Sequence, residues 1–112
     1  VDSGNTIEIP RQLKAVGESV VMPGALRLRV RTNAPWVLAV TGLKADGFRI
    51  ELRRRGDAEW QSFDEITGSM ILAFADRGGF YEFEYDLRVT LMSAPIPRAP
   101  TLITPQFILD PL

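Results

Sequence analysis

Hydrophobic and polar residues alternate with a period of two along much of the chain, and the most regular stretch runs from Phe80 to Leu91. Apolar residues there fall on one side and charged residues on the other, because successive side chains of a strand point to opposite faces. A helix would need apolar residues three and seven positions after Tyr81, and both positions carry charges. The pattern therefore predicts a half-buried strand over 80–91.

The same alternation predicts shorter strands elsewhere in the chain, at 6–9, 19–22, 26–31, 36–41, 48–53, 70–74 and 103–109. Both faces of segment 70–74 are apolar, which favours a central strand that is covered on two sides. Pro105 removes a backbone donor from the last strand, which favours an edge position. Segments 12–16 and 58–66 are ambiguous, and each fits either a loop or a single helical turn.

Many short strands with Gly and Pro turns between them favour an all-β fold. We predict an immunoglobulin-like two-sheet antiparallel sandwich of about 7–9 strands, with an open barrel as the alternative. A chain of 112 residues is long enough for one hydrophobic core, so we expect a single domain over 1–112. Trp36 opens a predicted strand and suits a core position between the sheets, and core packing is also expected of Tyr81 and Tyr85.

The charge balance and the missing residue types exclude several kinds of chemistry. The chain has 13 basic and 14 acidic residues, a net charge of −1, and neither Cys nor His. This composition argues against a nucleic-acid partner and excludes thiolate, disulfide and His-based chemistry. No segment reaches the run of about 18 apolar residues that a membrane helix needs. We expect no catalytic residues, no metal, no cofactor and no small-molecule substrate.

Two rows of opposite charge share the same spacing of two residues. They are Arg27, Arg29 and Arg31, and Glu82, Glu84 and Asp86. They could lie side by side as solvated outer faces of one sheet, or the row of one subunit could meet the opposite row of the next, in a contact that builds filaments. Among the aromatic residues, Trp60 has polar neighbours and is therefore the candidate for ligand contact.

The chain ends offer a second candidate for contact between subunits. Residues 1–5 are small and polar, and Ile7 and Ile9 then point to one side of a short strand. A terminal strand of this kind, within 1–10, can leave its own domain and add to the edge of a neighbour. The alternative is that it pairs inside its own sheet, and the sequence favours neither.

Two segments carry a resemblance to known families. Segment 31–40, in which a strand is followed by Asn33, a small residue and Trp36, resembles a passage in secreted bacterial immunoglobulin-like domains. Segments 79–87 and 101–109 are similar to the closing hairpin of fimbrial and spore-coat-type subunits. The resemblance implies an exported, extracellular, non-catalytic protein whose signal peptide has been removed.

The expected function is therefore that of a structural subunit of a fibre, pilus or surface layer. Such a subunit would have copies of itself as partners and would assemble by strand addition and complementary charges. The alternative function is that of a carbohydrate- or protein-binding accessory module of a cell-surface protein.

Overall fold

The longest alternating stretch of the sequence forms the centre of the fold. In the computed structural model, β8 (Gly79–Leu91) pairs antiparallel with β3 (Ser19–Thr32) on one side and with β5 (Phe48–Arg54) on the other. The two-residue strands β1 (Asp2–Ser3) and β6 (Gln61–Ser62) extend this sheet A to the order β1-β3-β8-β5-β6. The structure describes residues 2–3, 7–9, 13, 15–63, 66–93 and 101–112.

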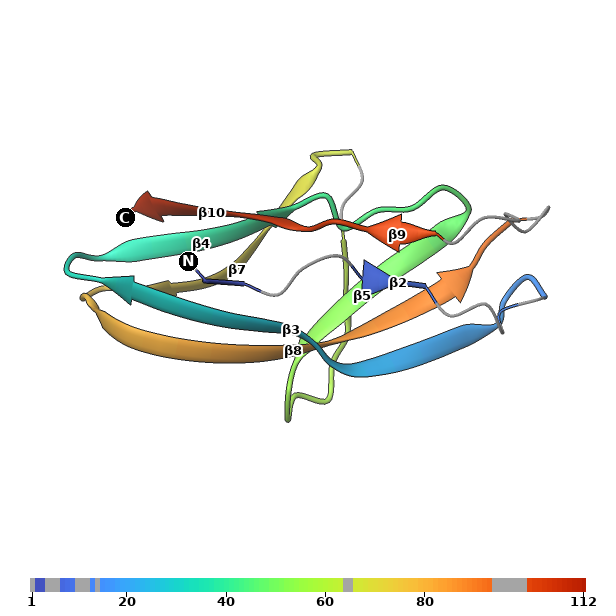
Figure 1. Cartoon of the computed structure of the whole chain (residues 1–112), viewed down its shortest axis with the longest axis horizontal. Coiled ribbons are helices and arrows are strands. Elements are labelled where there is room, and N and C mark those ends of the chain that lie inside the picture. Colours follow the sequence, from blue (N-terminus) through green and yellow to red (C-terminus); the bar gives the residue numbers. More distant parts are fainter. Residues whose placement is uncertain (1, 4–6, 10–12, 14, 64–65, 94–100) are drawn as a thin grey trace.

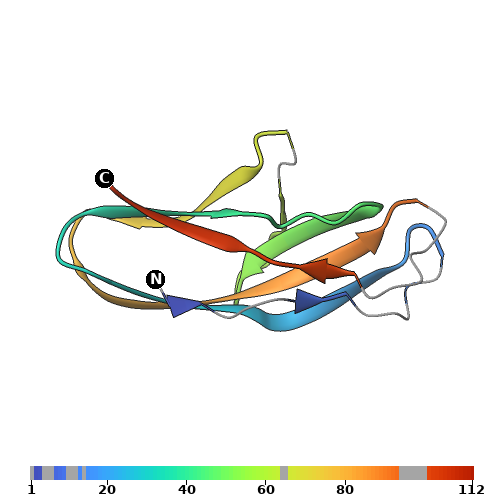
Figure 2. The ribbon, with the colours of Figure 1, turned by 45° about the horizontal axis from the view of Figure 1, so that its top comes forward.

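A second sheet packs against one face of the first. Sheet B has the order β10-β4-β7, with β4 (Trp36–Thr41) between β10 (Gln106–Pro111) and β7 (Ser69–Ala75). A separate short pair joins β2 (Ile7–Glu8) to β9 (Leu102–Ile103). The views show β4 and β10 side by side, in a layer distinct from β3 and β8 (Figures 1 and 2). All pairings among the described residues are antiparallel and these residues contain no helix, so the fold is all-β as predicted.

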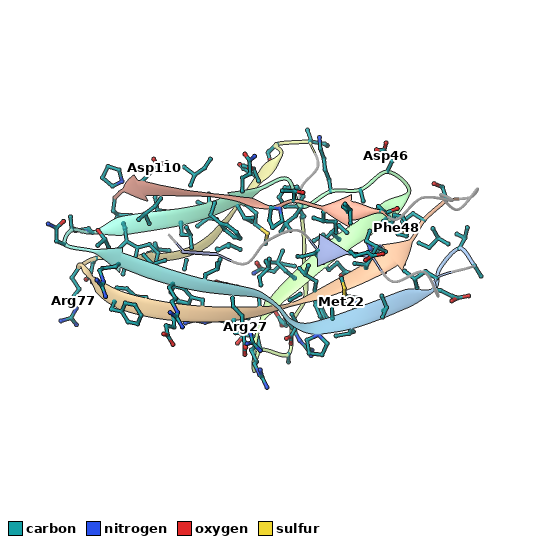
Figure 3. The ribbon with its side chains drawn as sticks, viewed as in Figure 1. Met22, Arg27, Asp46, Phe48, Arg77 and Asp110 are labelled. Carbon is teal, nitrogen blue, oxygen red and sulfur yellow. The ribbon has the colours of Figure 1, made fainter. Side chains whose placement is uncertain are left out.

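One hydrophobic core fills the space between the sheets (Figure 3). Its buried side chains are Ile9, Leu13, Leu26, Leu28, Val30, Trp36, Leu38, Val40, Leu43, Phe48, Ile50, Leu52, Phe63, Tyr85, Leu87, Val89, Leu91 and Ile103. Trp36 of β4 is only 1% exposed, and its ring packs edge-on against Tyr81 and Phe83 of β8, with centroids 5.1 and 6.0 Å away. The predicted core position of Trp36 is therefore confirmed, and these aromatic contacts join the two sheets.

Segments 19–22 and 26–31, expected as separate strands, form the single strand β3. The chain passes through Pro23 and Gly24 in a bulge, where the pairing with β8 shifts between Met22 and Leu26. Gly24 has a φ of +62°, a backbone conformation that glycine adopts without steric cost. The bulge therefore allows a proline and a glycine to lie inside a long strand.

The prediction of a central strand over 70–74 is wrong, because β7 lies at the edge of sheet B. Among the described residues its only strand partner is β4. Ile71 and Phe74 point away from the core and are 63% and 71% exposed. A continuous apolar run is expected for a strand covered on both faces, but here one face is left open to solvent.

The last predicted strand is divided at Pro105 into β9 and β10. Ile103 and Pro105 are buried, and Phe107 and Leu109 pack against the core, so alternate residues of the predicted strand face inward. β10 lies at the edge of sheet B, as the proline indicated. In the ambiguous segments, the described residues form turns and the short strand β6.

Candidate interaction surfaces

The two charged rows lie opposite each other on β3 and β8 of the same chain. Arg27 pairs with Glu84 at 2.9 Å between Nε and Oε1, and Arg29 pairs with Glu82 at 3.6 Å between the same atom types. Arg31 instead places its guanidinium over the ring of Phe80. The interpretation as neighbours in one sheet is confirmed. Contact between the rows of different subunits stays a prediction, and it would have to compete with these ion pairs within one chain.

Asp86, the third acidic residue of the row, is buried instead of solvated. It lies beside the bulge in β3, where the Gly24 N–H donates to its Oδ1 at 2.8 Å. Arg53 Nε donates to its Oδ2 at 3.1 Å. The hydrogen bond from Gly24, followed by that from Arg53, holds the pKa of Asp86 below its usual value. The carboxylate therefore fixes the bulge and joins β3, β8 and β5.

A second buried carboxylate on the outer face of sheet A belongs to Glu51 of β5. Arg88 of β8 donates two hydrogen bonds to it, from Nε at 3.0 Å and from Nη2 at 2.8 Å. Arg49 lies 3.5 Å from the same carboxylate. The paired hydrogen bond from Arg88 lowers the pKa of Glu51, although burial opposes this shift. The outer face of sheet A is thus a network in which buried and exposed charges have partners.

Trp60, the candidate for ligand contact, lies against this network. The guanidinium carbons of Arg53 and Arg88 lie 4.4 and 4.7 Å from its ring centroid, within the range of cation–π contacts. Its side chain is half-buried. The ring therefore contacts arginines of its own chain, and contact with a ligand stays a prediction.

The described part of segment 1–10 pairs inside its own chain. Ile7 lies opposite Ile103 in the β2–β9 ladder, and the Ile9 N–H donates to the Thr101 carbonyl at 2.9 Å. Ile9 is 3% exposed and belongs to the core. Residues 1, 4–6 and 10 lie outside the described residues. Exchange of this strand between subunits stays a prediction, and it would require Ile9 to leave the core.

Sheet B presents a very different outer surface. We call this surface the apolar face; it consists of Val37, Ala39, Ile71, Phe74 and Ile108. The strand register places Ile108, Ala39 and Ile71 in one row across the sheet, and Asp110, Val37 and Phe74 in the next, so the apolar face ends at Asp110 on β10. The three largest members, Phe74, Ile71 and Ile108, are among the exposed hydrophobic residues. Contiguous apolar patches of this kind mark interaction sites on soluble proteins.

β7 also differs from the other strands that end a sheet. Natural edge strands are usually short or carry charges or proline, which prevents unwanted pairing. In the described part of the chain, β1 and β6 have two residues each, and β10 contains Asp110 and Pro111. β7 has seven residues, and none is charged, proline or glycine. Sequence reasoning missed this edge, although the run of uncharged residues from 69 to 75 was a visible signal.

Two hollows on the surface are lined by described residues. A small one of about 180 Å³ lies beside Arg54, Asp57 and Tyr85. A larger, shallow one of about 510 Å³ is lined by apolar residues such as Phe63 and Met92 and by charged residues such as Lys44 and Arg49. The described residues contain no group of three or more side chains suited to hold a metal ion. No helix among them is long and apolar enough to cross a membrane.

Comparison with protein-family models, curated proteins and solved structures finds no match to this chain. The function must therefore be inferred from the geometry of the described residues alone. Of the surfaces above, the β7 edge with the adjoining apolar face is the one that combines exposed apolar side chains with a long strand that has no described strand on its outer side.

Proposed function

We propose that this protein is a non-catalytic structural subunit of an extracellular fibre, pilus or surface layer, in which copies of the chain join by strand addition. The two packed antiparallel sheets are interpreted as an immunoglobulin-like sandwich, a fold that suits repeated building blocks. The observation that carries the proposal is the long, uncharged edge of β7, with Ile71 and Phe74 exposed beside it.

Strand addition at β7 would use two sources of affinity. Backbone groups on the side of β7 that no described strand pairs with would form main-chain hydrogen bonds with an incoming strand. The exposed side chains of Ile71 and Phe74 would lose contact with water, and apolar burial contributes about 25 cal/mol per Å². No charged side chain of β7 would have to be desolvated, because the strand has none.

The charged face of sheet A has a different role in this proposal. Its ion pairs hold β3, β8 and β5 together, so complementary charge between subunits is not needed for assembly. Contacts between exposed charges weaken as salt screens them, whereas excluded salts strengthen apolar burial. Assembly through β7 is therefore expected to persist at high salt.

The alternative function is an accessory module that binds another protein or a carbohydrate at the cell surface. The same open edge favours it, because a strand of a different protein could add to β7 in the same way. The two functions differ in the behaviour of the purified chain. A self-assembling subunit grows in mass with concentration, and an accessory module stays monomeric.

The test compares the parent chain with Ile71→Lys, which places a charge on the β7 edge. The control is Ile108→Lys, on the same apolar face but on β10, at the opposite edge of sheet B. Both positions are exposed, so neither lysine should unfold the protein. Light scattering after size exclusion, and electron microscopy of concentrated samples, give the mass and form of the particles.

We expect the parent and Ile108→Lys to form larger species as concentration rises, and Ile71→Lys to stay near the monomer mass of 12.5 kDa. Raised salt should leave the assembly of the parent intact. A parent chain that stays monomeric at every concentration would contradict the proposal and favour the accessory module.

A further inference from the structure

We infer that the strand added to β7 is β7 of a second copy, running antiparallel, with Ile71 of each chain opposite Phe74 of the other. This inference rests on the proposed function, because it names the segment through which copies join. It is carried by a different observation, the bulge in the middle of β7.

The bulge changes which residues of β7 share a face. Leu38 of β4 pairs with Ala73, but the next residue, Ala39, pairs with Ile71, so Leu72 is the extra residue. Before the bulge, the side chains of Ser69 and Ile71 point away from the core. After the bulge, the side chain of Phe74 points away from the core. The remaining residues, Met70, Leu72, Ala73 and Ala75, pack against the core.

The bulge is a fixed part of the fold. Tyr85 of β8 is buried, and its hydroxyl crosses between the sheets to donate to the Leu72 carbonyl at 3.1 Å. The carbonyl of the extra residue thus has a partner inside the chain. The outward and inward positions along β7 are therefore set before any partner arrives.

A strand with plain alternation matches β7 along its whole length only by leaving Leu72 without an opposite residue, as β4 does. A second copy of β7, run antiparallel, carries the same extra residue at the same place. When Leu72 lies opposite Ala73 of the other copy, Ile71 lies opposite Phe74 and Met70 opposite Ala75. Every inward residue then faces an inward one, and every outward residue an outward one. A shift of one residue places inward side chains opposite outward ones, so one register is favoured.

The charges next to β7 are compatible with this register. Asp76 directly follows the strand, and in this register it lies opposite Ser69 of the other copy instead of another carboxylate. The pairing therefore brings no like charges face to face across the strands, which would destabilise it.

The size of the contact predicts its strength. Seven residues at about 3.3 Å each give an edge of about 23 Å, so the contact is limited to one short pair of strands. A stable complex buries about 800 Å² per partner. The pairing should therefore be weak and dependent on concentration. Since a two-fold contact closes on itself, the dimer would be the repeating unit, and a fibre would need a second contact.

Disulfide cross-linking can test the register, because the natural chain contains no cysteine. Ile71→Cys and Phe74→Cys are prepared separately, one with a longer tag, mixed in equal amounts and oxidised gently. Directly opposed residues have Cα atoms about 4.5–5.5 Å apart, within the range of a disulfide. Two copies of Ile71 would be separated by about three residues along the strands, or roughly 10 Å, which is too far. Ile108→Cys serves as the control on the same apolar face.

We expect the mixed 71–74 disulfide to form in large excess over the 71–71 and 74–74 products, and Ile108→Cys to cross-link with neither variant. If the chain assembles but the mixed product is no more abundant than random pairing gives, the register is wrong while the proposed function stands. If neither the parent nor the mixed variants associate at any concentration, both proposals are contradicted.

Discussion

The outer faces of the two sheets are both open to water, yet they are built from opposite chemistry. On sheet A the charges are paired within the chain, as in the contacts of Arg27 with Glu84 and of Arg53 with Asp86. On sheet B the row that contains Ile71 is apolar and ends at a strand with an open edge. The comparison teaches that a conspicuous row of charges is not by itself an interface. The open surface is the one where exposed apolar side chains adjoin a long strand without a second strand partner in the described part of the chain.

The charged face is itself divided between exposed and buried groups. Ion pairs between exposed side chains, such as Arg29 with Glu82, contribute between about 0.2 and 1 kcal/mol. Breaking a buried pair costs more, because a charge or a backbone donor is left without a partner. The stability of sheet A should therefore depend on Asp86 and Glu51 more than on the regular rows that the sequence shows.

The largest expected effect is that of Asp86→Ala. This change leaves the Gly24 N–H and the Arg53 guanidinium without their shared acceptor, and we expect a loss of about 2–3 kcal/mol in the free energy of unfolding. The matched control is Glu82→Gln, because the Glu82 side chain is 61% exposed and lies 3.6 Å from Arg29. Its effect should stay within about 0.5 kcal/mol.

Equilibrium denaturation with urea measures both variants. Equal losses for Asp86→Ala and Glu82→Gln would show that the bulge does not depend on the buried carboxylate. A third variant, Asp86→Asn, separates the effect of the charge from that of the hydrogen bond, because its amide oxygen can still accept from the Gly24 N–H.

A smaller effect is expected from acid. The pKa values of Glu51 and Asp86 are lowered in the folded state by their hydrogen bonds from Arg88 and Gly24, respectively. Folding then favours the ionised forms, so this stabilisation is complete above the unfolded pKa values of about 4 and is lost as pH falls through the lower folded values. The free energy of unfolding should drop below about pH 4, and Glu51→Gln should make that drop shallower. An unchanged slope in this variant would contradict the assignment of the acid response to the Glu51–Arg88 pair.

The sequence was sufficient for the regular parts of the fold. Unbroken alternation predicted β8, β4 and β5 closely, and the apolar position of Trp36 predicted its place in the core. The charged rows were recognised, but their partners depend on strand register, which single-strand periodicity does not contain. The role of Asp86 was missed for this reason, since it arises from the bulge at Gly24 on a different strand.

The candidate surface was missed for a related reason. Segment 70–74 has apolar residues on both faces, and the alternation cannot tell whether a second layer covers the outer one. The extra residue Leu72 also shifts the phase of β7, so that Ile71 and Phe74 share a face although three positions separate them. Long-range strand pairing and the local bulge together decide which side chains of β7 are exposed. A pattern of period two describes neither of them.

Hydrogen exchange of the β7 backbone amides at low and high protein concentration tests the central claim most directly. An added strand protects the open edge, so exchange in β7 should slow as concentration rises, while β10 keeps its rates and Ile71→Lys shows no change. Exchange in β7 that is independent of concentration, or new protection that appears on β10 instead, would contradict the claim that copies of this chain join at the β7 edge.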